Sequence, residues 1–199
     1  MELFEKIFQK IWDRQKISPI LSEKIRLKEH QRFFSIFASG LLKNSFEPQV
    51  LASSSVIGFH GTILYLPSEI SFSPRKQVNY NTYLNLILQS VAIKNLNLFS
   101  LKKEDTPLEQ RLYVLQKINL INSYLDREYP NYDSFQKSLI QEIDAYCQRT
   151  SLSQNYEMEL YKDWDQVCLS RKETQIENLI VKYNKIKKNE KLPDFLFFT

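Results

Sequence analysis

Glycine is scarce in this chain of 199 residues, which contains only 3 glycines. Nucleotide-binding folds rely on glycine-rich turns, because a residue without a side chain lets the backbone approach phosphate groups closely. The scarcity of glycine therefore argues against such a fold, and it also disfavours a β-sandwich with many tight turns. Helices joined by short loops suit this composition better.

Cysteine and histidine are also rare, with two of each. Cys147 and Cys168 are too few for a disulfide framework. His30 and His60 stand in no HxxxH or HExxH spacing, so a zinc site would need unrelated positions to converge. The chain also lacks the GxSxG and GxxxxGK[ST] motifs. We therefore expect no catalytic residue, no metal and no cofactor.

Long apolar runs are absent, and the excess of positive charge is small. No run reaches the ~18–20 residues that span a bilayer, and the N-terminal sequence MELFEKIFQKIWDRQK has acidic residues from position 2, unlike a secretory signal. The net charge of +4 is too small to indicate nucleic-acid binding. These features predict a cytoplasmic protein without a transmembrane segment and without a nucleic-acid partner.

Helical periodicity covers most of the chain. Apolar residues spaced three and four apart predict a first helix over residues 3–12, and Ser18 with Pro19 predicts the start of a second helix that runs to about Leu42. Three more helices are expected. The first lies at about 79–97 and the second runs from Pro107 to Tyr129. The third follows Asp133, which would be the N-cap of that helix. A long last helix is expected at about 156–188.

The helical period fails between about residues 44 and 79. Val50-Leu51, Val56-Ile57 and the segment 62–66 have the β-branched and aromatic content of short strands. Gly58 and Gly61 stand where a turn would join two of them. The sequence thus predicts one mainly α domain over residues 1–199. We expect a bundle of about six helices with a small β-hairpin inserted between the second and third.

The segment from Leu64 to Ala92 contains a recognisable order of motifs. Leu64-Tyr65-Leu66-Pro67 is followed by a loop with Ile70, Phe72 and Pro74, then by Asn79-Tyr80-Asn81-Thr82-Tyr83 and an apolar helix. This order resembles the N-terminal region of the nitric oxide reductase activation protein family (NorD/CbbO). In that family a Leu-x-Leu-Pro strand end precedes an Ile-x-x-Phe-Pro-like loop and an Asn-x-x-x-Tyr helix start. The closing Leu192-Pro193 segment is similar to one that follows the helical region there.

The resemblance has clear departures. The family's double-glycine turn is reduced here to Ser39-Gly40, and lysine and asparagine replace its arginine-rich character. Family members continue into a von Willebrand factor A domain with an Asp-x-Ser-x-Ser metal-adhesion motif, which this chain lacks. The resemblance implies the N-terminal helical part alone, as a fragment or a truncated relative. It carries over no metal-adhesion function.

The resemblance implies a non-catalytic accessory role beside a MoxR-type AAA+ ATPase that activates a target metalloenzyme. The partners expected are that ATPase, the target enzyme, or both. Two alternatives remain open: a helical interaction or regulatory scaffold of another pathway, and a helical metal-binding enzyme that uses His60 and scattered carboxylates. Six residues form the predicted interaction surface: His60, Tyr65, Phe72, Arg75, Phe195 and Phe197.

Overall fold

The computed structural model describes residues 24–44, 46–53, 57–71, 73–98 and 107–149. These residues form four helices and five short strands. The elements are β1 (Ile25–Arg26), α2 (Leu27–Leu41), β2 (Gln49–Ala52), β3 (Gly58–His60), β4 (Ile63–Leu66), β5 (Glu69–Ile70), α3 (Lys76–Asn95), α4 (Pro107–Glu128) and α5 (Tyr132–Arg149). The helices predicted at 3–12 and 156–188 lie outside the described residues.

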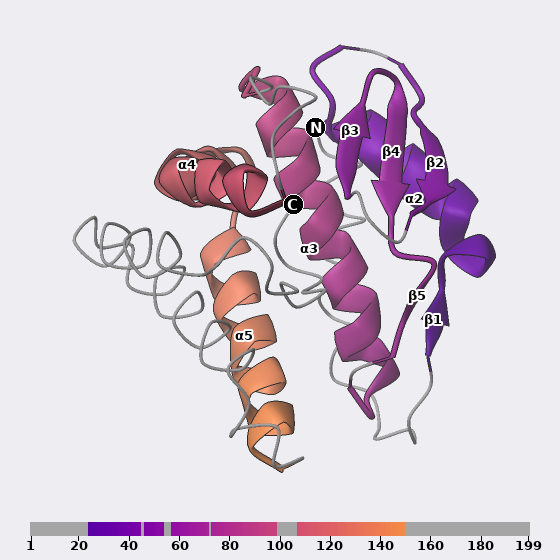
Figure 1. Ribbon diagram of the computed structural model, residues 1–199, viewed down its shortest axis with the longest axis vertical. Helices are drawn as coiled ribbons and strands as arrows, with labels where there is room; N and C mark the ends of the chain where they lie inside the picture. Colours follow the sequence, from indigo (N-terminus) through magenta and orange to yellow (C-terminus); the bar gives the residue numbers. More distant parts are fainter. Residues whose placement is uncertain (1–23, 45, 54–56, 72, 99–106, 150–199) are drawn as a thin grey trace.

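Helix α3 is the centre of the described fold (Figure 1). The strands and α2 pack on one side of it, and α4 and α5 pack on the other. Tyr83, Ile87, Leu88 and Val91 on this helix are completely buried, and buried residues occur around its whole circumference. A helix that is apolar on most sides must be covered on most sides. The helix predicted at about 79–97 is therefore confirmed, although it starts at Lys76 and ends at Asn95.

Strands β2, β4 and β3 form a mixed sheet with β4 in the middle. β2 runs parallel to β4, with Val50 opposite Leu64, whereas β3 runs antiparallel to β4, with Phe59 opposite Leu64. The two-residue turn between β3 and β4 contains Gly61 at a φ of 62°. Glycine adopts this left-handed conformation without steric cost. The predicted turn at Gly61 is therefore confirmed.

The second sheet consists of β1 and β5, which pair antiparallel with Ile25 opposite Ile70. Both isoleucines are essentially inaccessible to solvent. The prediction that Ile25 belongs to the second helix is wrong, because its backbone is extended and α2 begins only at Leu27. The burial of two β-branched side chains against each other favours the strand at this position.

The prediction of a mainly α bundle of about six helices with one small β-hairpin is also wrong. Instead of one hairpin, the described residues contain a three-stranded mixed sheet and a two-stranded sheet. The β3–β4 hairpin exists, but β2 adds a parallel strand to it, and the predicted strand residue Ile57 lies outside β3. Parallel pairing joins residues distant in sequence, so local turn signals do not reveal it.

Side chains of α2 cover the outer edge of β2. The hydroxyl of Ser35 donates a hydrogen bond to the carbonyl of Pro48 at 2.6 Å, and the side-chain amide of Gln31 donates to the carbonyl of Val50. An exposed strand edge presents unpaired carbonyl and amide groups that can pair with another chain. Helix α2 therefore satisfies two of these carbonyls and closes that part of the edge.

Two contacts fix the connection from β4 to α3. The hydroxyl of Tyr83 donates to the carbonyl of Pro67 at 2.7 Å, at the bend between β4 and β5. The side chain of Asn79 pairs with the backbone of Ser73, accepting from its N–H at 3.0 Å and donating to its carbonyl at 2.9 Å. All four residues are buried. The first turns of α3 are thus bonded to the chain that precedes them.

Helices α4 and α5 follow each other in the chain, contact each other and both pack against α3. Helix α4 begins at Pro107, as predicted, and α5 begins at Tyr132. Asp133 therefore lies inside the first turn of α5, where it pairs with Lys137 at 2.7 Å, and the prediction that it is the N-cap is wrong. The hydroxyl of Tyr132 donates to Oδ1 of Asn85 at 3.1 Å.

Across the described ranges, no helix combines the length and apolarity that a membrane crossing requires.

Candidate interaction surface

The outer face of the three-stranded sheet brings two of the predicted surface residues together. Successive side chains of a strand point to opposite faces, and Val50, Leu64 and Leu66 are buried on the inner face. The outer face therefore carries the alternate side chains, which are half-buried or exposed. They are Gln49, Leu51, His60, Ile63 and Tyr65.

The register places His60 and Tyr65 as diagonal neighbours. His60 stands opposite Ile63, and Tyr65 stands between Leu51 on β2 and Gly58 on β3. Gly58, at a φ of 114°, has no side chain, so β3 contributes no side chain beside the ring of Tyr65. The result is a row of apolar groups on the outer face, with the exposed His60 at one end of it.

Lys94 joins this sheet to the end of α3. Its ammonium donates to the carbonyl of Gly61 at 2.6 Å and lies over the rings of Phe46 and Phe59, at 5.3 and 4.9 Å from their centres. A cation over an aromatic face is attracted by the ring quadrupole. Lys94 therefore holds the turn of the β3–β4 hairpin in place. Its position in the last turn of a helix, where a cation is favourable, was the one local signal for this residue.

Arg75 lies elsewhere in the structure. It precedes the first turn of α3 and forms an ion pair with Glu142 of α5 at 2.6 Å. The turn at Gly61 contacts the other end of α3 through Lys94, and a helix of this length extends about 30 Å. Arg75 thus does not share a surface with His60 and Tyr65. Phe72, Phe195 and Phe197 lie outside the described residues.

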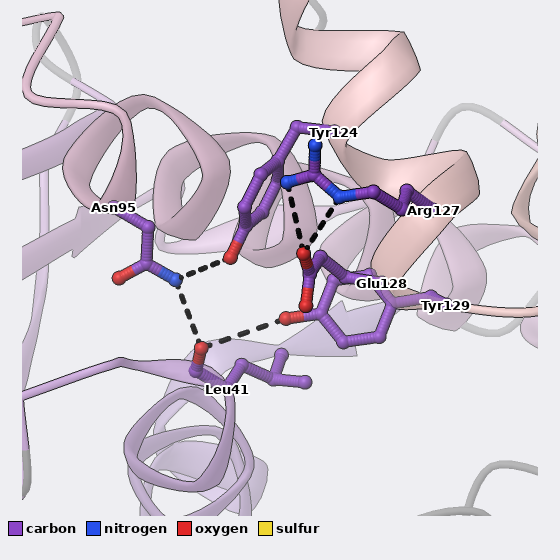
Figure 2. A network of polar contacts seen from close by, with 6 residues as sticks. All are labelled: Leu41, Asn95, Tyr124, Arg127, Glu128 and Tyr129. Atoms are coloured by element: carbon purple, nitrogen blue, oxygen red, sulfur yellow. Dashed lines mark hydrogen bonds and ion pairs between the residues drawn. The ribbon is translucent and has the colours of Figure 1, made fainter.

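A second polar site joins the C-terminal ends of α2, α3 and α4 (Figure 2). The side-chain amide of Asn95 donates to the carbonyl of Leu41 at 3.0 Å and to the hydroxyl of Tyr124 at 2.9 Å. The hydroxyl of Tyr129 donates to the same carbonyl at 3.5 Å. The last carbonyls of a helix have no partner inside it. Asn95 and Tyr129 supply partners for the carbonyl of Leu41.

Two cations flank the ring of Tyr124 at this joint. The ammonium of Lys43 lies 5.3 Å from the ring centre and the guanidinium of Arg127 lies 5.5 Å from it. Arg127 also pairs with Glu128 at 2.9 Å (Figure 2). Positive charge near helix C-termini is favourable because of the helix dipole. Burial raises the pKa of the Tyr129 hydroxyl, with Tyr124 and Glu128 adding to the effect, so Tyr129 remains a neutral donor.

An aromatic cluster joins α2 to α3 around His30. The ring of His30 lies 5.3 Å from that of Tyr80, edge to face, and 5.8 Å from that of Phe34. Phe34 in turn lies 5.0 Å from Tyr83. Burial lowers the pKa of His30; Glu29 opposes this effect and Lys76 adds to it. Burial also raises the pKa of Tyr80 to about 12. These rings contribute to packing between the two helices.

Within the residues that the structure describes, no group of three or more histidine, cysteine, aspartate or glutamate side chains is placed to hold a metal ion. No protein-family model matches the chain, and no curated protein or solved structure matches it. The relationship to the NorD/CbbO family thus remains a prediction from the motif residues.

Proposed function

We propose that the chain is a non-catalytic accessory domain, related to the N-terminal part of NorD-type activators, that acts with a MoxR-type AAA+ ATPase on a target metalloenzyme. The proposal depends on the segment from Leu64 to Ala92, in which the order of motifs resembles that of the family. In this view the partner chain contributes ATP hydrolysis, and this domain contributes a binding surface.

The observation that carries the proposal is that the motif residues contact one another. Pro67 ends the Leu-x-Leu-Pro motif and accepts the hydrogen bond from Tyr83, the last residue of Asn-x-x-x-Tyr. Asn79, the first residue of that second motif, binds the backbone of Ser73 between the two. The shared order of residues thus corresponds to one structural unit, the bend from β4 through β5 into α3. A relative with the same residues at the same spacing could build the same unit.

Co-expression with a MoxR-type ATPase tests this proposal. We expect an affinity-tagged full-length chain to retain the ATPase through purification. Of the predicted surface residues, His60 and Tyr65 lie together on the outer sheet face. The double variant His60→Glu/Tyr65→Ser should reduce the amount of ATPase retained. The control is Arg75→Gln, which changes the distant Arg75–Glu142 pair instead. Absence of ATPase from the wild-type eluate would contradict the proposal.

A second candidate function is a protein-interaction scaffold of another pathway. The half-exposed outer row of Leu51, Ile63 and Tyr65 favours a binding role of this kind without naming the partner. Crosslinking and mass spectrometry of the tagged chain in its native cells would separate the two candidates. A dominant partner other than an AAA+ ATPase or its target enzyme, lost in the His60→Glu/Tyr65→Ser variant, would favour the scaffold.

A further inference from the structure

One face of α2 presents two basic residues and an apolar residue in a line. Lys28, Arg32 and Ile36 are four residues apart, so they lie one above the other on the same helical face. All three are exposed, and 53% of Ile36 is accessible to solvent. The opposite face of α2 carries the buried Phe34, Phe37 and Ala38. We call the exposed set of Lys28, Arg32 and Ile36 the α2 ridge.

The two basic residues of the α2 ridge have no carboxylate partner among the described residues. Of the nearby carboxylates, Glu29 pairs with Arg26, and Glu69 pairs with both Arg26 and Lys24. The carboxylate of Glu47 instead accepts a hydrogen bond from the hydroxyl of Ser35 at 3.2 Å. Like charges four residues apart on a helix repel each other. A partner carboxylate would relieve this repulsion. The ridge is therefore complementary to an acidic surface.

A groove with a volume of about 310 Å³ adjoins the ridge at Lys28. Its lining comes from β1, the start of α2, the end of β2, and β5 with the bend before it. The lining residues are Arg26, Leu27, Lys28, Gln31, Ala52, Ser68 and Glu69. The groove extends the ridge toward β2, so a bound segment would contact both the helix and the end of the strand.

We propose that the α2 ridge binds an acidic amphipathic helix of a partner protein. The partner helix would carry two carboxylates four residues apart and an apolar side chain four residues beyond the second. Lys28 and Arg32 would pair with the carboxylates and Ile36 would pack on the apolar side chain. The three positions of the ridge span about 12 Å along the helix. The α2 ridge is separate from the outer sheet face. The inference rests on the proposed function only because both suppose a protein partner.

Fluorescence anisotropy with the full-length chain tests the inference. The probe is a fluorescein-labelled helical peptide with glutamates at positions i and i+4 and leucine at i+8. We expect saturable binding that weakens at least tenfold in Lys28→Glu/Arg32→Glu and several-fold in Ile36→Ser. Higher salt should also weaken it, because exposed ion pairs are screened. A peptide with glutamine in place of both glutamates should bind at least tenfold more weakly.

Control variants come from helices α4 and α5. Leu120 is 49% accessible, so Leu120→Ser repeats the change of Ile36→Ser at another surface. Lys137 is exposed, so Lys137→Glu reverses one charge there, with the loss of its pair with Asp133. Both controls should bind the peptide as the wild type does. Binding that the ridge variants leave unchanged, or no saturable binding, would overturn the inference. Sedimentation could instead show that the wild type self-associates and that Ile36→Ser does not. The ridge would then bind a second copy of the chain, and the inference would be overturned.

The two proposals fail separately. If the ATPase co-purifies but the peptide does not bind, the α2 ridge is excluded and the accessory role stands. If the peptide binds through the ridge but no ATPase co-purifies, the ridge stands and the accessory role is contradicted.

Discussion

The hydroxyl of Tyr83 donates a hydrogen bond to the carbonyl of Pro67, and both residues are buried. This bond joins the central helix to the bend between the two sheets. Burial raises the pKa of Tyr83, with the nearby Glu69 adding to the effect, so the hydroxyl stays protonated and donates. The contact lies within residues 64–92, the segment on which the proposed relationship to the NorD/CbbO family depends.

Tyr83→Phe should destabilise the domain by about 1–2 kcal/mol, because the buried carbonyl of Pro67 would lose its donor. Urea unfolding followed by circular dichroism would measure the change. Tyr65→Phe is the matched control, since Tyr65 is half-buried in β4 and its hydroxyl forms no hydrogen bond within the described ranges. An equal and small effect of the two substitutions would show that the Tyr83–Pro67 bond does not stabilise the bend.

Gly61→Ala should destabilise the β3–β4 hairpin by about 1–2 kcal/mol, because a residue with a Cβ is strained in the left-handed region. The strain would be purely conformational, since an added Cβ at Gly61 meets no heavy atom within 4 Å. Gly61→Asn should cost less, because asparagine tolerates this conformation better than alanine. Equal stabilities of the two variants in thermal unfolding would contradict the turn geometry.

Asn95 and Tyr124 should be energetically coupled at the joint of the three helix ends. Asn95→Ala removes the donor to both Leu41 and Tyr124 and the acceptor for the backbone N–H of Lys43. We expect a loss of about 2 kcal/mol for Asn95→Ala. A double-mutant cycle of Asn95→Ala and Tyr124→Phe, measured on the free energy of unfolding, should give a coupling energy of about 0.5–1 kcal/mol. Strict additivity of the two substitutions would argue against the network in Figure 2.

Stability should fall with acidification through His30. Its folded-state pKa is lowered by burial, so the unfolded chain binds a proton at higher pH than the folded chain does. The contribution of His30 to stability is therefore present above its ordinary pKa of 6.5 and is lost as the pH falls through the folded value. Urea midpoints at pH 7.5 and pH 5 should differ less in His30→Gln than in the wild type. Identical pH dependence in both proteins would contradict this role.

Local signals in the sequence located two helices, α3 and α4. The Pro107 start of α4 and the apolar residues of α3 predicted elements that the structure contains. Both predictions depend on residues within a few turns of each other, where helical spacing and helix-start chemistry act. The turn at Gly61 is likewise local, because its two strands are neighbours in sequence.

The same local signals could not predict the pairing of strands that are distant in sequence. Ile25 fits a helical pattern in sequence, but its strand partner Ile70 is 45 positions away, and nothing near Ile25 indicates that partner. The parallel pairing of β2 with β4 was missed for the same reason. Within the candidate surface, the register of β3 and β4 places His60 and Tyr65 on the same face of the sheet. Arg75 is separated from them because it lies at the opposite end of α3.

The accessory role is tested most directly by titrating the purified full-length chain against a purified MoxR-type ATPase in a calorimeter. We predict saturable binding that is weakened at least tenfold in His60→Glu/Tyr65→Ser and unchanged in Arg75→Gln. No heat of binding, together with separate elution of the two proteins on size exclusion, would contradict the account.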